Sequence, residues 1–256
     1  IRRVDGIERW LEVRSAAILD HGVPAVLVVA SDITERRCNE ERLAFLARHD
    51  PLTGLANRMV IADRLEQAVR LARRRGDLCG LLLLDLDGFK SINDTFGHMI
   101  GDRVLREVAD RMRAELRACD TVGRLGGDEF AIVLPHLQSA AGAELVAQRL
   151  LAALGRPLPI GGASWRVSAS IGIAIGPEHG CDAESLLRCA DLALYQVKAR
   201  AGGNWLVYEP GMLQQEVYRR QIEAALRRHL AAGELEVFYQ PLVELASGRI
   251  VGAEAV

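Results

Sequence analysis

The hydrophobic pattern in the middle of the chain predicts a sheet with one fully buried strand. Gly80 to Asp85 is a continuous apolar run that ends in a carboxylate, which is typical of a central strand covered on both faces. Thr121 to Leu125 and Glu129 to Leu134 instead alternate between apolar and polar residues, as half-buried strands do. Two more apolar segments, Trp165 to Ile175 and Trp205 to Tyr208, complete the predicted sheet.

Other segments carry apolar residues at the spacing of a helix surface. The helices predicted in this way cover residues 34–48, a segment starting at Asn57 or Asp63, and residues 102–118, 140–154 and 184–199. Asp50-Pro51 ends the first of them, because proline disfavours helical geometry in the residue before it. The order of helices and strands predicts an α/β (α+β) fold with helices around a mixed sheet.

The two ends of the chain predict different elements from those of the middle. Residues 1–33 predict two or three strands, with a turn at residues 20–24, and are too few to hold a core alone. From Met212 a charged helix leads to the apolar segment 235–241. The helix at 34–48 is interpreted either as a solvated linker or as a helix that pairs with a second copy.

A double glycine lies between the two alternating strands. Gly126 and Gly127 predict a tight two-residue hairpin turn that needs positive φ angles, with Asp128 at or just past the turn and Glu129 next to it. Taken alone, this is an ordinary turn with solvated acids. The second acidic strand end, at Asp85, favours a site where two carboxylates meet.

Composition narrows the classes of function. The 256 residues are half apolar, and 32 basic against 34 acidic residues give a net charge of −2, which argues against a nucleic-acid-binding surface. Five cysteines without a C-x-x-C pair suggest neither a disulfide framework nor a zinc site, and fit a reducing cytoplasm. No apolar run approaches the roughly 20 residues of a membrane helix, so no membrane contact is expected from this chain. It begins at Ile1, and we expect a fragment whose parent can be anchored elsewhere.

Four motifs in this order resemble the GGDEF family of diguanylate cyclases. They are Asp50–Arg58, Asp85–Asp94, Phe96–Asp102 and Gly126–Phe130. The resemblance covers about residues 45–208 and implies a palm-like, ferredoxin-related βαββαβ core of the nucleotidyl-cyclase kind. It implies that two GTP molecules condense to cyclic di-GMP and two pyrophosphates, on a homodimer in which each domain holds one GTP.

The resemblance also assigns the reacting residues. Asp85, Asp128 and the Leu86 carbonyl would bind Mg²⁺ or Mn²⁺, for which oxygen ligands are suited. Asp128 matches the proposed general base, Glu129 is a second acid, and Lys90 would stabilise charge in the transition state. Taken singly, Asp85 is a solvated strand-end acid and Lys90 a surface cation.

Substrate binding and inhibition are assigned in the same way. Asn93 and Asp102 match the guanine readers, while Phe89 and Lys198 match residues that contact the substrate; Asp102 alone would be read as a helix N-cap. The family's Gly-Arg-Asn is replaced after Lys198 by Gly202-Gly203-Asn204, displaced by one residue, with Arg200 as a candidate substitute for the missing arginine. Arg117 and Asp120 match the RxxD site at which cyclic di-GMP inhibits, with Arg149 a further member by position; alone they would be a solvated ion pair.

The flanks resemble two other families. Residues 1–33 resemble the end of a PAS sensory domain, 34–49 a linker helix, 50–208 the cyclase domain, and 209–256 a linker helix with the truncated start of an EAL-type phosphodiesterase domain, whose first metal ligand Glu254 would match. The alternative function is a domain that binds GTP or cyclic di-GMP without turnover and regulates a phosphodiesterase. A purely structural connector is a third interpretation.

Overall fold

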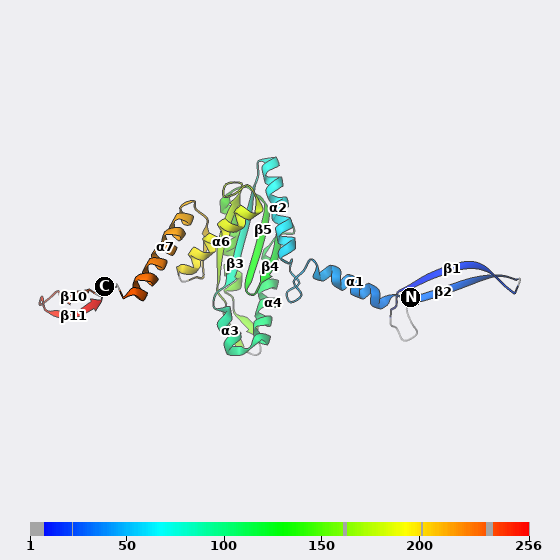
Figure 1. The fold of residues 1–256 in the computed structure, drawn as a ribbon, viewed down its shortest axis with the longest axis horizontal. Helices are drawn as coiled ribbons and strands as arrows, with labels where there is room; N and C mark the ends of the chain where they lie inside the picture. Colours follow the sequence, from blue (N-terminus) through cyan, green and yellow to red (C-terminus); the bar gives the residue numbers. More distant parts are fainter. Residues whose placement is uncertain (1–7, 22, 161–162, 201, 234–237, 256) are drawn as a thin grey trace. The chain divides into compact units, whose positions relative to one another are not determined.

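The computed structural model describes residues 8–21, 23–160, 163–200, 202–233 and 238–255. The chain divides into two compact units, Ile1–Tyr208 and Glu209–Val256. Figure 1 shows the order of the elements. Their bounds are β1 Leu11–Asp20, β2 Val23–Asp32, α1 Thr34–Leu46, α2 Arg58–Arg75, β3 Leu78–Leu86, α3 Phe89–Phe96, α4 His98–Glu115, β4 Thr121–Gly126, β5 Glu129–Leu137, α5 Ala140–Leu154, β6 Leu158–Ile160, β7 Ala163–Trp165, β8 Ala169–Gly176, α6 Ala183–Ala199, β9 Trp205–Val207, α7 Gly211–Ala232, β10 Tyr239–Val243 and β11 Ile250–Ala255.

A five-stranded sheet in the order β4-β5-β3-β8-β9 forms the centre of the first unit. The first four strands pair antiparallel, and β9 is added parallel to β8. With α3 and α4 after β3, and α5 before β8, the chain order is βαββαβ. The predicted ferredoxin-related core with surrounding helices is confirmed.

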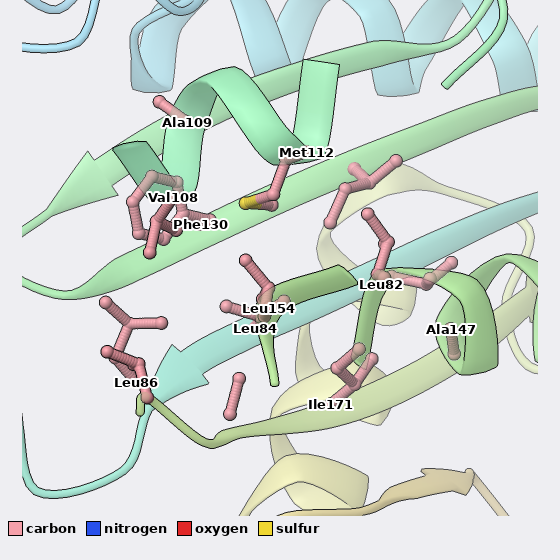
Figure 2. Close-up of a cluster of buried hydrophobic side chains, with 14 of the residues drawn as sticks. Leu82, Leu84, Leu86, Val108, Ala109, Met112, Phe130, Ala147, Leu154 and Ile171 are labelled. Atoms are coloured by element: carbon pink, nitrogen blue, oxygen red, sulfur yellow. The ribbon is translucent and has the colours of Figure 1, made fainter. Parts of the chain in front are cut away.

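Strand β3 is covered on both faces, as its unbroken apolar run predicted. Leu82, Leu84 and Leu86 point to the side of α4 and α5, where Phe130 and Met112 complete the cluster (Figure 2). The intervening Leu81 and Leu83 pack instead with residues of α2 and α6. Each fully buried leucine contributes about 2 kcal/mol, so this strand fixes the position of its own charged end.

The prediction of one strand from Trp165 to Ile175 is wrong. The chain forms β7, which pairs with β6 in a separate two-stranded ribbon, and then enters the main sheet as β8 at Ala169. Alternation of apolar residues continues across the change of sheet, because Val167 between the two strands is buried too. Helix boundaries shift as well: α4 begins at His98 rather than near residue 102 and ends at Glu115, and α1 ends at Leu46.

The flanking elements form simple pairs. β1 and β2 make a ten-residue antiparallel hairpin, and β10 pairs with β11 after α7. The parts of the predicted terminal segments at residues 1–7 and 234–237 lie outside the described residues. Among the helices that the structure describes, none is long and apolar enough to cross a membrane.

Candidate active site

The hairpin between β4 and β5 places Asp128 in the turn itself. Gly126 pairs with Glu129 across a register shift, so the two turn residues are Gly127 and Asp128, and the prediction of a Gly126-Gly127 turn is wrong by one residue. Both glycines have positive φ, 146° and 53°, which a residue with a Cβ adopts only with strain. The extra residue in β4 brings the Asp128 carboxylate to the tip.

The hairpin tip lies beside the end of β3. Glu129 pairs in register with Asp85, and the Leu86 N–H donates to the Asp128 carbonyl at 3.4 Å. Lys198, on the last turn of α6, reaches the same point, with its Nζ 2.6 Å from Asp85 Oδ2. One strand end, one hairpin and one helix end therefore meet here.

Asp85 is the buried member of this group, with 8% of its surface exposed. Burial raises its pKa, and the negative charges of Asp128 and Glu129 act in the same direction, whereas the bond to Lys198 opposes them. Lys198 is thus the cation that limits the rise in the pKa of this carboxyl. The donor set suits a divalent cation, because three nearby acids repel one another and a cation between them relieves the repulsion. Among the described residues, however, no group of three histidine, cysteine or carboxylate side chains is arranged as a preformed metal site.

Helices α3 and α4, which follow β3 in the chain, carry the predicted guanine-binding residues. Asn93 of α3 packs directly against Gly101 of α4, where the ring of Phe89 also approaches, and a Cβ on Gly101 would overlap the Asn93 carboxamide oxygen. Asp102 follows Gly101 and is half-buried. Of the predicted guanine readers, Asn93 therefore lies at the contact between α3 and α4, and Asp102 is the next residue of α4 after that contact. Lys90 is exposed in the first turn of α3.

An arginine braces the hairpin from the side. The Nε and Nη2 of Arg124 donate to the Gly127 carbonyl at 2.9 and 2.7 Å, and its Nη1 donates to the Asp50 carboxylate at 3.2 Å. Asp50 in turn accepts from the N–H and hydroxyl of Thr53, at 2.8 and 2.7 Å. Burial raises the pKa of Asp50, but the bonds from Thr53 and Arg124 outweigh it and the pKa is lowered. The turn at residues 50–54 is thereby tied to the backbone next to Asp128.

The predicted RxxD residues lie in the loop between α4 and β4. Asp120 Oδ2 accepts from the backbone N–H of Arg117 at 2.9 Å, so the contact between the two residues involves the backbone of Arg117. A hollow of about 530 Å³ is lined by both residues, His136 and Arg149. Arg149 contacts the Glu115 carboxylate at 3.3 Å and also donates to the Glu115 carbonyl.

The comparison with known families identifies the family to which this fold belongs. The family profile described as "Diguanylate cyclase, GGDEF domain" matches residues 47–204. The chain belongs to the GGDEF family.

Several members of the family are close in sequence and structure. The bifunctional diguanylate cyclase/cyclic di-GMP phosphodiesterase MucR of Pseudomonas aeruginosa is 41% identical over 220 residues, which cover 86% of this chain and 32% of MucR. The solved GGDEF domain of TpbB from the same organism is 41% identical with a TM-score of 0.64, covering 65% of this chain and 97% of that one. The coiled coil and GGDEF domain of DgcB from Caulobacter crescentus, solved with cyclic di-GMP, is 29% identical with a TM-score of 0.61, covering 68% and 93%. The chain thus spans about a third of the full length of MucR.

Within this GGDEF domain, sequence reasoning missed three supporting residues. Arg124 and Asp50 form what we call the brace, which is their ion pair together with the bonds from Arg124 to the Gly127 carbonyl. Asp87 accepts from the Ser170 hydroxyl at 2.7 Å and from the Gly203 N–H at 2.9 Å. Asp87 thus anchors the segment that departs from the family's usual Gly-Arg-Asn. Their positions in the sequence could have indicated a supporting role. Asp87 lies two residues after Asp85, and Arg124 lies in a half-buried strand two residues before the glycines. Arg200 lies at the end of α6, beside a small hollow that Gly202 and Asn204 also line.

Proposed function

We propose that this domain is a diguanylate cyclase that condenses two GTP molecules into cyclic di-GMP and two pyrophosphates. The observation that supports this best is the convergence at the end of β3: Asp128 in the hairpin turn lies next to Asp85, and Lys198 is within bonding distance. Asn93 and Asp102, which suit guanine, lie on the adjoining helices. A carboxylate accepts both N1–H and the 2-amino group of guanine, and adenine offers neither pairing.

The reaction forms one bond and breaks one at each phosphorus atom. The ribose 3′ oxygen of one GTP attacks the α-phosphorus of the other, the bond to the β-phosphate oxygen breaks, and pyrophosphate leaves. Asp128 accepts the 3′ hydroxyl proton, and Lys90 and Lys198 stabilise the phosphate charge. Since each domain holds one GTP, two copies face each other, and the reaction requires a homodimer.

Mg²⁺ is the cofactor that this proposal includes, with Mn²⁺ as a substitute. Asp85, Asp128 and the Leu86 carbonyl would hold it, with Glu129 close by. When bound, it would supply charge neutralisation at the phosphates and a more acidic 3′ hydroxyl. Lys198 would then leave Asp85 and contact the triphosphate.

The direct test is incubation of the chain with GTP and Mg²⁺ over a range of protein concentrations, with pyrophosphatase present and cyclic di-GMP measured by mass spectrometry. A rate that rises more steeply than the protein concentration supports a dimeric cyclase. Absence of product at every concentration, although GTP binds, contradicts it.

The second candidate is a regulatory domain that binds GTP without turnover. It is favoured by the altered segment after Lys198, which lacks the family's arginine. In this case GTP binding would be normal, and the product would be absent even in a dimer enforced by a fused coiled coil.

Three further proposals concern regulation. Cyclic di-GMP inhibits by binding at Arg117 and Asp120, which is supported by the hollow beside them and by the DgcB domain solved with this dinucleotide. Residues 1–33 are the end of a PAS domain, which is supported by the exposed apolar side chains of β2, such as Val26 and Val28, because a lone hairpin is marginal in water. Residues 209–256 begin an EAL domain.

A further inference from the structure

Strand β9 is too short to cover the whole edge of β8. It pairs with β8 from Ile171 to Ile173, and the residue after β9, Tyr208, still donates its N–H to the Ile173 carbonyl at 2.8 Å. Ile175 of β8 lies past the end of β9 and is fully buried. Its backbone groups need other partners, because a buried N–H or carbonyl without one costs free energy.

His179, in the loop between β8 and α6, supplies both of these partners. Its own N–H donates to the Ile175 carbonyl at 2.8 Å, and its Nδ1 accepts from the Ile175 N–H at 3.0 Å. A ring nitrogen that accepts a hydrogen bond carries no proton, so this contact requires the neutral imidazole with its proton on Nε2. A protonated ring would face the Ile175 N–H with a second donor, and the bond would be lost.

The half-buried ring of His179 also contacts the residue at the end of the domain. It meets the ring of Tyr208 edge-on, with centroids 5.3 Å apart and planes at 66°. The Tyr208 hydroxyl is hydrogen-bonded to the Cys189 thiol of α6, which donates to the His179 carbonyl at 3.2 Å. Tyr208 is the last residue of the first compact unit. These three residues, which we call the exit cluster, therefore join the loop, α6 and the point where the chain leaves the sheet.

Within the exit cluster, His179 is the residue that changes charge at moderately acidic pH. Burial raises the pKa of the Cys189 thiol and that of the Tyr208 hydroxyl, so both stay neutral at and below neutral pH. The positive charge of Arg188 on α6 opposes both shifts but does not reverse them. On the side of β3, the pKa of the buried Cys79 thiol, opposite Gly176, is raised by burial too.

The His179 ring itself is held neutral by its surroundings. Burial lowers its pKa from the usual 6.5, and the negative charge of Glu178, exposed in the same loop, acts in the opposite direction but is outweighed. The unfolded chain therefore takes up this proton first. The neutral ring stabilises the fold above about pH 6.5, and its contribution is lost as the pH falls through the pKa of the folded state.

We propose that His179 is a pH-sensitive latch, which holds Tyr208 and the exit of the chain from the sheet while its ring is neutral and releases them when the ring is protonated. Protonation removes the acceptor of the Ile175 N–H, so the ring leaves the strand edge and gives up its contact with Tyr208. The latch is separate from the candidate active site, because Ile175 pairs with Gly80 at one end of β3 and Asp85 lies at the other end.

The test is an NMR titration of the whole chain from about pH 7.5 to about pH 5, the range in which histidines titrate. At the upper limit, the ring nitrogen shifts of His179 should show the tautomer with its proton on Nε2. As the ring becomes protonated, the amides of Ile175 and Tyr208 should exchange with solvent about tenfold faster, after correction for the intrinsic pH dependence of exchange, because one hydrogen bond is lost.

His179→Asn is the deciding variant. The carboxamide oxygen of asparagine takes the place of Nδ1 as acceptor and does not titrate, so both amides should stay protected over the whole range. The matched control is His21→Asn in the turn between β1 and β2, where asparagine tolerates the φ of 48°. This control should lose protection at acidic pH as the unaltered chain does.

The latch would be overturned by any of several results. An equal loss of protection in His179→Asn would show that another group titrates, and a loss at Ile175 without one at Tyr208 would show that the ring does not control the exit. A proton on Nδ1 at neutral pH, or a ring that stays neutral down to about pH 5, would contradict the latch in the unaltered chain, without recourse to any variant. None of these measurements includes GTP, so they leave the proposed cyclase activity to its own assay.

Discussion

Replacing Arg124 by methionine should separate the stability of the hairpin from its chemistry. Methionine keeps the apolar stem but removes the guanidinium, which makes two bonds to the Gly127 carbonyl and contacts Asp50. The two charged side chains are only 13% and 17% exposed, so water compensates poorly for the loss. The neighbouring turn residue is Asp128, the proposed base.

The expected size follows from these contacts. Hydrogen bonds to charged groups contribute about 1.5–3 kcal/mol, and removing one partner of a largely buried ion pair costs roughly 3–5 kcal/mol, so we expect Arg124→Met to lose about 3–4 kcal/mol in the free energy of unfolding. A turn displaced by about 1 Å would lower kcat on the order of 100-fold. Urea unfolding and initial rates at saturating GTP measure the two effects, with Arg75→Met as the control.

Two results would refute this reasoning. A loss of unfolding free energy below about 0.5 kcal/mol, the range of an ordinary surface substitution, would show that the brace is not formed in solution. A large loss of stability with kcat unchanged would show that the brace holds the domain together but does not position Asp128.

Three further outcomes test other contacts. Gly101→Ala should displace Asn93 and raise the KM for GTP about tenfold, with a smaller change in kcat, because the added methyl overlaps the Asn93 carboxamide; an unchanged KM in initial-rate measurements would remove Asn93 from guanine binding. Lys198→Ala should raise the pKa of Asp85 further in the metal-free chain, since the bond to Lys198 is what opposes burial, and NMR titration of the Asp85 carboxyl measures this; an unmoved titration would contradict it. Asp50 has a lowered pKa in the folded chain, so its contribution to stability is present above its unfolded pKa and is lost as pH falls through the folded value. Asp50→Asn should therefore lower Tm at pH 7 and flatten the dependence of Tm on acidic pH, and an unchanged slope below the ordinary carboxyl pKa of 3.8, the side to which the pKa of Asp50 is shifted, would count against it.

The sequence predicted the central sheet well, for a physical reason. An unbroken apolar run such as Leu81 to Leu84 has few alternatives to burial on both faces, and periodic helices such as residues 140–154 were placed with their bounds correct. The strand predicted from Trp165 failed because alternation reports burial and not which sheet a segment joins. The turn was misplaced by one residue because the bulge between Arg124 and Gly126 leaves no periodic signal.

The site was predictable only in part. The motifs pointed to Asp85 and Asp128, and the fold brings them to one edge. The supporting contacts of Arg124 and Asp87 join segments that are far apart in the chain, 74 and 116 residues for the bonds to Asp50 and Gly203, so no local pattern encodes them. Likewise, the bond of Lys198 to Asp85 depends on how α6 packs on β8.

The central claim, that Asp128 at the hairpin tip is required for making cyclic di-GMP, is tested most directly by comparing Asp128→Asn with Asp63→Asn. Asp63 is an exposed acid on α2, remote in sequence from the hairpin, and serves as the matched control. With GTP binding checked by calorimetry, the account predicts that Asp128→Asn binds GTP but forms cyclic di-GMP at least about 1,000-fold more slowly, whereas Asp63→Asn is unaffected. Turnover by Asp128→Asn within tenfold of the unaltered chain would contradict it.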